Sequence, residues 1–394
     1  MGAAPGRVDR DDSLEALLRL LEVDAGPGRE AAVADAVQRL AADAGVEAKR
    51  FASDSAHKSI GFGERGNLVL KLPGRGVRGP RRMFSAHMDT VPLCVGQRPV
   101  VDGDTVRGED PSLALGGDDR SGCGVLVSLV RRLAGGDVSH PPLTFAWLVQ
   151  EEVGLRGAKH IGAKKLGEPE RAYNFDGASP GTLVVGATGD VAVDATIRGH
   201  ASHAGVAPQK GVSAAGVFAA ALAELDSEGW HGLIQKPGGE GTSNVGVLTG
   251  GAATNVVMDR LDLRAEVRSH SPKFRRKILD RWRRAFEAAA KKATSVDGLA
   301  ASVEWAEELK YEAFKLPASS PVVASAKAAA KACGLEPRTV VGNGGLDANW
   351  LVAHGIPTVT LGCGQRGIHT TAETLHLPDY FDACDVAFEL ATAA

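Results

Sequence analysis

The sequence predicts an α/β protein: a mainly parallel sheet with helices on both faces, interrupted by an inserted α+β module of the ferredoxin-like kind. At 394 residues the chain exceeds the size of one typical core, so we expect two domains. Apolar strand-like runs alternate with helix-like segments before residue 187 and again after residue 314, as in parallel sheets covered by helices. Between these parts, the runs alternate between apolar and polar residues, which favours strands with one solvated face.

The first domain begins with two expected helices, at residues 13–21 and 29–44, where apolar residues recur at helical spacing and Ser13 is the expected N-cap. Strands are expected at residues 68–72, 83–86, 143–149 and 172–175, with helices at 121–133 and 155–162. After the insertion the pattern resumes with helices at 321–332 and 347–353 and strands at 338–341 and 356–361. The last of these strands leads to His369.

The inserted segment has the element order β-α-β-β-α-β. Its strands are expected at residues 191–197, 243–248, 261–267 and 301–305, and its helices at 213–225 and 273–292. We therefore expect a catalytic domain formed by residues 1–187 and 312–394, and an inserted lid or dimerisation domain formed by residues 188–311.

Composition excludes several classes of protein. A net charge of −3 with interspersed signs gives no surface for nucleic acid or for a membrane. Asp11 and Asp12 lie where a signal peptide needs an apolar core, so we expect a cytoplasmic protein. Five widely spaced cysteines argue against a disulfide framework.

Two short motifs resemble functional loops, but neither has the required flanks. GFGERG at residues 61–66 matches a dinucleotide-binding pattern, yet a strand-like segment follows it where a helix is needed. GASPG at residues 177–181 matches a nucleophile elbow, yet Pro180 and another strand-like run follow Ser179. We interpret both as loops.

Histidine and carboxylate side chains gather at the expected strand ends. A parallel sheet places its ligands at the carboxyl ends of its strands. Imidazole and carboxylate groups suit zinc, manganese or cobalt. The residues at or beside these ends are His87, Asp89, Asp118, Asp119, Glu151, Glu152 and Asp176. The sequence therefore predicts a metal site.

These residues lie in motifs that resemble the M20 family of metallopeptidases, closest to the tripeptide aminopeptidase (peptidase T) type. The motifs are HMDT (87–90), GGDDRSG (116–122), QEEVGLRGA (150–158), NFDG around Asp176, GHASHAG (199–205), GGAATNVVMD (250–259), NGGLDAN (343–349) and HTTAE (369–373). They follow the family order over nearly the whole chain. Leu346 departs from the serine or threonine that the family usually has before Asp347, which puts substrate specificity in question.

The resemblance implies two divalent ions, usually zinc, with cobalt or manganese as alternatives. Asp118 would bridge them. His87 and Asp176 would complete one site, and Glu152 and His369 the other. In the family the peptide bond after the bridging acid is typically cis, which implies a cis bond between Asp118 and Asp119.

The remaining roles also follow from the resemblance. Glu151 would be the general base, and Asp89 would lie behind His87 and fix its tautomer. His203 would stabilise the oxyanion, in several family members from the partner subunit of a dimer. Asn255 and Arg268 would bind substrate carbonyl or carboxylate groups.

The expected activity is hydrolysis of amide bonds in small peptides by an aminopeptidase of the tripeptidase type, with a homodimer formed through the inserted domain. The presence of Asp, instead of Glu, at position 176 favours this branch. A carboxypeptidase or an N-acyl amino acid deacylase of the same family is the alternative, and an inactive binding homologue is a remote one.

Overall fold

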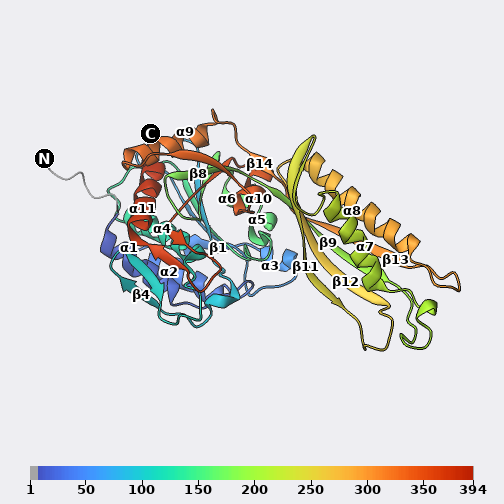
Figure 1. Ribbon diagram of the computed structural model, residues 1–394. Helices are drawn as coiled ribbons and strands as arrows, with labels where there is room; N and C mark the ends of the chain where they lie inside the picture. The colour runs from blue at the N-terminus through green and yellow to red at the C-terminus, as the bar shows by residue number, and fades with distance from the viewer. Residues whose placement is uncertain (1–7, 394) are drawn as a thin grey trace. The chain divides into compact units, whose positions relative to one another are not determined.

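The computed structural model describes residues 8–393, which divide into two compact units (Figure 1). Unit 1 contains the chain up to Ala187 and again from Lys315, and unit 2 contains Thr188–Phe314. Among residues 8–393, no helix combines the length and the apolar composition needed to cross a bilayer.

Unit 1 is built on a nine-stranded sheet whose central strands, β6, β3, β7 and β16, are parallel to one another. The strands run in the order β1 (Phe51–Ser53), β2 (Leu68–Leu72), β6 (Leu143–Leu148), β3 (Arg82–His87), β7 (Arg171–Phe175), β16 (Thr358–Leu361), β8 (Thr182–Ala187) and β14 (Phe314–Lys315), and β15 (Arg338–Gly342) also pairs with β8. This confirms the expected mainly parallel sheet.

Both faces of the sheet are buried, because side chains alternate between the faces and every residue of β3 and β6 is buried. On one face, Met83 and Ala146 pack against the helices α5 (Arg156–His160), α6 (Ala163–Leu166) and α10 (Asp347–Ala353). On the other face, Phe84 stacks on Phe145 and Phe175, and the long helix α4 (Gly117–Ala134) contacts β3 and β7. Helices α1 (Arg10–Leu21), α2 (Ala31–Asp43) and α11 (Leu377–Thr392) pack on α4, α9 (Pro321–Ala332) packs on α11, and α3 (Ala56–Ile60) on α5.

A small antiparallel sheet in unit 1 has no counterpart in the sequence prediction. Its strands run in the order β17 (Gln365–Arg366), β18 (Thr374–His376), β5 (Thr105–Gly108) and β4 (Pro99–Asp102). Each strand has two to four residues, too few for a recognisable period. The sheet brings the segment before Asp118 beside the loop that contains His369.

The cap of the first helix was predicted at the wrong residue. The side chain of Asp9 accepts a hydrogen bond from the backbone N–H of Asp12 at 3.0 Å and caps α1. Ser13 lies inside the helix, where its hydroxyl donates to the carbonyl oxygen of Asp9 at 2.6 Å. Asp and Ser are both favoured caps, and the helix begins at the earlier of the two.

Unit 2 is a five-stranded antiparallel sheet with the helices α7 (Ala214–Ser227) and α8 (Pro272–Lys292) on one face (Figure 1). The strands run in the order β10 (Gly232–Lys236), β11 (Gly239–Gly250), β12 (Arg260–Ser269), β9 (Gly189–Arg198) and β13 (Ser302–Tyr311). The α+β insertion is therefore present, but its order includes one strand more than predicted. Strand β10 was missed because it is a short edge strand, joined to β11 by a tight turn at Pro237 and Gly238.

Candidate metal centre

Three neighbouring parallel strands deliver the acidic and histidine residues to one edge of the sheet in unit 1. Strand β3 ends at His87, β6 is followed by Glu151 and Glu152, and β7 is followed by Asp176. Because β3 pairs in parallel with both β6 and β7, these ends lie side by side.

Asp118 contacts two histidines, one through each carboxylate oxygen. Its Oδ1 lies 3.1 Å from Nε2 of His87, and its Oδ2 lies 3.2 Å from Nε2 of His369. The same nitrogen of His369 lies 3.0 Å from Oε2 of Glu152. Each carboxylate oxygen of Asp118 therefore faces a different histidine.

Two overlapping groups of side chains could hold a metal ion, with ligand atoms within 4.8 Å of one another. One group is His87, Asp118 and Glu152, and the other is His87, Asp119 and Asp176. With the contacts of His369, all five predicted ligands lie together in unit 1.

Asp119 lies in this cluster and accepts hydrogen bonds that fix the surrounding backbone and side chains. Its Oδ2 accepts a hydrogen bond from the backbone N–H of His87 at 3.1 Å. Its Oδ1 accepts from the N–H of Gly122 at 3.0 Å and from Nε2 of Gln365 at 2.9 Å. A Cβ at position 122 would lie 2.1 Å from the carbonyl oxygen of Phe175, so glycine is required there. The peptide bond between Asp118 and Asp119 is cis, as the family resemblance implied.

The charges of the cluster fit divalent cations. Burial raises the pKa of Glu152 to about 7 and that of Asp176 to about 6. Against the effect of burial, hydrogen bonds from His369 and His87 lower the pKa of Asp118, and the bond to Asp118 raises the pKa of His369 to about 9. Oε1 of Glu152 is buried without a hydrogen-bond partner in residues 8–393. Crowded carboxylates and an unused ligand oxygen are the donor set that two divalent ions would satisfy.

Asp89 supports the next loop more directly than it supports His87. Its two carboxylate oxygens accept hydrogen bonds from the backbone N–H groups of Glu151 at 2.9 Å and Glu152 at 3.1 Å. Nδ1 of His87 lies 3.0 Å from the carbonyl oxygen of Asp89 and 3.6 Å from its carboxylate. The carbonyl contact keeps a ring proton on Nδ1 of His87, so Nε2, which faces Asp118, is the nitrogen that a metal ion would bind.

Glu151 belongs to neither group of potential ligands within the described chain. Burial raises the pKa of Glu151 well above its ordinary value, although the charge of His87 opposes the shift. Among the neighbouring carboxylates, that of Asp347 contributes most to the rise. A carboxylate that is outside the ligand groups and has a raised pKa suits a general base near neutral pH.

Sequence reasoning missed three buried acids around this centre. Glu30 accepts hydrogen bonds from the N–H groups of Gly28 at 2.7 Å and Gln150 at 3.0 Å. Glu373 accepts from the N–H groups of Gly116 and Asp118. Asp347 is 1% exposed, and neither of its carboxylate oxygens has a hydrogen-bond partner in the part of the chain that is described. Glu373 and Asp347 carried a signal, because they lie in the motifs HTTAE and NGGLDAN, whereas Glu30 carried none.

Two non-glycine residues in these loops have left-handed backbone conformations. Gln150, just before Glu151, has φ 55°, and His369 has φ 62°. Such conformations are uncommon for residues with a Cβ and concentrate at functional sites, where surrounding contacts hold them.

The predicted lid residues all lie in unit 2. His203 and Asn255 are neighbours, since the N–H of Ala204 donates to the carbonyl oxygen of Asn255 at 2.9 Å. Arg268 lies on β12, opposite Asp190 of β9, and its Nη2 is 2.9 Å from Oε2 of Glu266. Its guanidinium is therefore already paired inside unit 2.

A mainly parallel sheet with histidines and carboxylates gathered at its carboxyl edge defines an α/β metallohydrolase, and comparison with known proteins specifies the family. The sequence pattern of peptidase family M20/M25/M40 matches residues 83–393. The chain belongs to this family and is a metallopeptidase.

Relatives of this chain include the protein YqjE of Bacillus subtilis strain 168, which is 33% identical over 367 residues, 93% of this chain and 94% of YqjE. The crystal structure of a tripeptidase from Staphylococcus aureus has a TM-score of 0.87 and 29% identity, covering 98% of this chain and 99% of that one. That of the aminopeptidase PepT from Bacillus cereus has a TM-score of 0.83 and 32% identity with the same coverage. The resemblance to peptidase T is thereby confirmed.

Proposed function

We propose that this protein is a two-metal aminopeptidase of the tripeptidase type, which hydrolyses amide bonds in small peptides with Glu151 as general base. The observation that carries the proposal is the contact of Asp118 with both His87 and His369, one through each oxygen. The similarity to a tripeptidase and to an aminopeptidase, at 29% and 32% identity, supports the peptide substrate.

His87, Asp176 and one oxygen of Asp118 would hold the first ion, and Glu152, His369 and the other oxygen of Asp118 the second. The imidazole and carboxylate donors suit zinc, with cobalt or manganese as alternatives. When bound, the two ions supply the Lewis acidity that polarises the scissile carbonyl group and lowers the pKa of water.

Glu151 takes the proton of the attacking water and later gives it to the leaving amine. Its raised pKa allows it to hold that proton between the two transfers. Asp89 fixes the backbone of Glu151 and so keeps the base at a constant place beside the ligand Glu152.

His203 is prepared to donate a hydrogen bond to an oxyanion. Its Nδ1 accepts hydrogen bonds from the N–H groups of Gly205 and Val206, both at 3.2 Å. The ring proton of the neutral imidazole must then lie on Nε2. Nε2–H is therefore the donor that would stabilise the tetrahedral intermediate, with Asn255 beside it.

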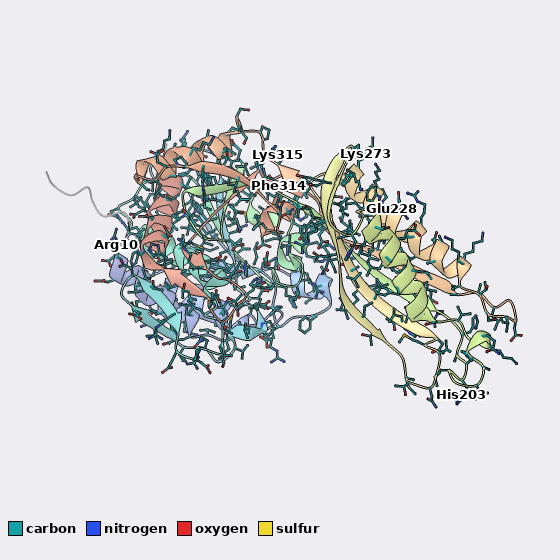
Figure 2. The ribbon with its side chains drawn as sticks, viewed as in Figure 1. Arg10, His203, Glu228, Lys273, Phe314 and Lys315 are labelled. Carbon is teal, nitrogen blue, oxygen red and sulfur yellow. The ribbon has the colours of Figure 1, made fainter. Side chains whose placement is uncertain are left out.

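The two ends of unit 2 cannot serve one small substrate from the same chain. Arg268 lies opposite Asp190 at the start of β9, whereas the segment with His203 follows Arg198 at the end of β9. At roughly 3.3 Å per residue, the two ends of this strand are about 25 Å apart. In Figure 2, His203 lies at the end of unit 2 remote from Phe314. An extended tripeptide spans only about 10 Å. We therefore propose that His203 and Asn255 act in the site of a second copy, in a homodimer.

A carboxypeptidase or an N-acyl amino acid deacylase of the same family would share the metal centre. An inactive binding homologue is disfavoured because all five ligands and the base are present. Turnover distinguishes these functions. Protein reloaded with zinc, cobalt or manganese should hydrolyse Ala-Ala-Ala and release its first residue, and should act poorly on N-acetyl-Ala-Ala-Ala. Preference for the acetylated peptide, or release of the last residue, would refute the aminopeptidase assignment.

A further inference from the structure

Glu373 is a buried acid that is neither a proposed ligand nor the proposed base. The residue is 3% exposed, and it lies four residues after His369 in unit 1. Buried carboxylates are rare without a partner, because removing the charge from water is costly unless hydrogen bonds compensate for it.

Both carboxylate oxygens of Glu373 accept hydrogen bonds from the backbone of the segment that ends at Asp118. Oε2 accepts a hydrogen bond from the N–H of Gly116 at 2.8 Å, and Oε1 accepts from the N–H of Asp118 at 3.0 Å. The carboxylate therefore spans Gly117, where an added Cβ would lie 3.3 Å from Oε1. Two charge-assisted bonds to alternate residues fix both the position and the direction of this segment.

The loop that contains Glu373 also delivers a proposed ligand to the same acid. His369 contacts Oδ2 of Asp118 at 3.2 Å, while Glu373 holds the backbone of Asp118 from the other end of the loop. Strands β17 and β18 flank this loop, and β18 pairs with β5, which precedes the Asp118 segment. One short loop thus fixes Asp118 at its backbone and at its side chain.

Glu373 is outside both groups of potential ligands among the described residues. We infer that Glu373 is a positioning residue: it sets the backbone of Asp118 so that one carboxylate oxygen faces each histidine and each of two bound cations. The inference rests on the proposed two-metal site, and it assigns to HTTAE a second task besides supplying His369.

Glu373 would form the same hydrogen bonds if it only stabilised the fold. The test must therefore separate stabilisation of the fold from positioning of Asp118. Glu373→Gln keeps the size of the side chain and one acceptor oxygen, but its NH₂ group cannot accept the second N–H. Glu373→Ala removes both acceptors. Glu109→Gln makes the same change of charge at an exposed position nine residues before Asp118 and is the matched control.

The experiment measures the affinity for each of two Zn²⁺ ions by competition with a chelator, together with the unfolding midpoint of the metal-free proteins. We expect Glu373→Gln to weaken the binding of at least one ion by about 10- to 100-fold, the range typical of outer-shell partners. Glu373→Ala should weaken it further, and Glu109→Gln should match the wild type. In Glu373→Gln, kcat for Ala-Ala-Ala should fall while KM stays unchanged.

Wild-type affinity for both ions in Glu373→Gln would overturn the inference. So would an equal loss of metal-free stability in Glu373→Gln and Glu373→Ala without a change in the affinity of the folded protein, because that pattern marks a structural role alone. If both variants fail to fold without metal, the positioning role is likewise rejected. Metal affinities that change as expected in a protein that cleaves no peptide would support the inference and refute the proposed function instead.

Discussion

The backbone N–H of Glu151 donates a hydrogen bond of 2.9 Å to the carboxylate of Asp89. The other oxygen of Asp89 accepts from the N–H of Glu152 at 3.1 Å, so one buried side chain fixes the proposed base and a proposed ligand together. The family resemblance led us to expect Asp89 behind His87, and the structure adds this second set of contacts.

Asp89→Asn should therefore lower the rate of catalysis. The loss should exceed the one expected if Asp89 acted only on the binding of metal by His87. The amide can accept only one of the two N–H groups, which frees the backbone at Glu151 or Glu152. We expect kcat for Ala-Ala-Ala to fall by about 100-fold, in line with the loss of a positioning contact. Steady-state kinetics at saturating zinc would measure it, and a variant within twofold of the wild type would contradict this role.

Glu30 gives the protein a stability that depends on pH. Burial, together with the charge of Asp89, raises the pKa of Glu30 from 4.5 to about 7. Between these values the folded protein binds more protons than the unfolded chain, so stability falls as the pH rises. Compared with Glu30→Gln, the wild type should lose up to about 3 kcal/mol between pH 4.5 and pH 7.

Urea unfolding of metal-free wild type and Glu30→Gln at pH 5 and pH 8 would measure this difference. Glu109→Gln, at an exposed position, should show no comparable change with pH. A gap between wild type and Glu30→Gln that is the same at both pH values would show that Glu30 does not retain its proton in the folded state.

The assignment of His203 to a second copy predicts complementation between inactive variants. His203→Ala and Glu151→Gln should each lose most of their activity. When the two are unfolded and refolded together, half of the dimers should be mixed, and one of the two sites in each mixed dimer has both residues intact. About one quarter of wild-type activity should return, as the symmetry of a dimer requires. No recovery, despite mixed dimers in native mass spectrometry, would place His203 in its own chain's site.

Removal of metal should destabilise the folded protein, because ions that bind only the folded state stabilise it by mass action. At a free zinc concentration about 1,000 times the dissociation constant, one ion contributes about 4 kcal/mol. We expect a chelator to lower the unfolding midpoint by several degrees and added zinc to restore it. An unchanged midpoint would mean that the acidic cluster is stable without cations.

Much of the fold could be predicted because its central elements are long and periodic. Helices α9 and α10 were predicted with the observed bounds, and strand β2 as well. Strand β10 was missed because it lies at the edge of its sheet and adjoins a tight turn. The strands of the small sheet were missed because two to four residues are too few to show a period. The cap of α1 was misplaced because Asp9 and Ser13 are equally good candidates in sequence.

The residues proposed as ligands were visible in the sequence because each lies at a strand end or in a family motif. The residues that hold them were not. Glu30 and Glu373 act on backbone N–H groups, which every residue but proline has, so no pattern of side chains marks their partners. Glu30 lies at the start of a helix, where a carboxylate is ordinary, and only the fold shows that Gln150 is its partner.

The central claim is that His87, Asp118, Glu152, Asp176 and His369 hold two cations together. The most direct measurement is the metal content of purified protein after loading with zinc and desalting, by elemental mass spectrometry, in the wild type and in Asp118→Ala. We expect two ions per chain in the wild type, and fewer than one in Asp118→Ala because both sites lose a shared ligand. A wild type with no more than one ion, or an Asp118→Ala variant that keeps two, would contradict the account.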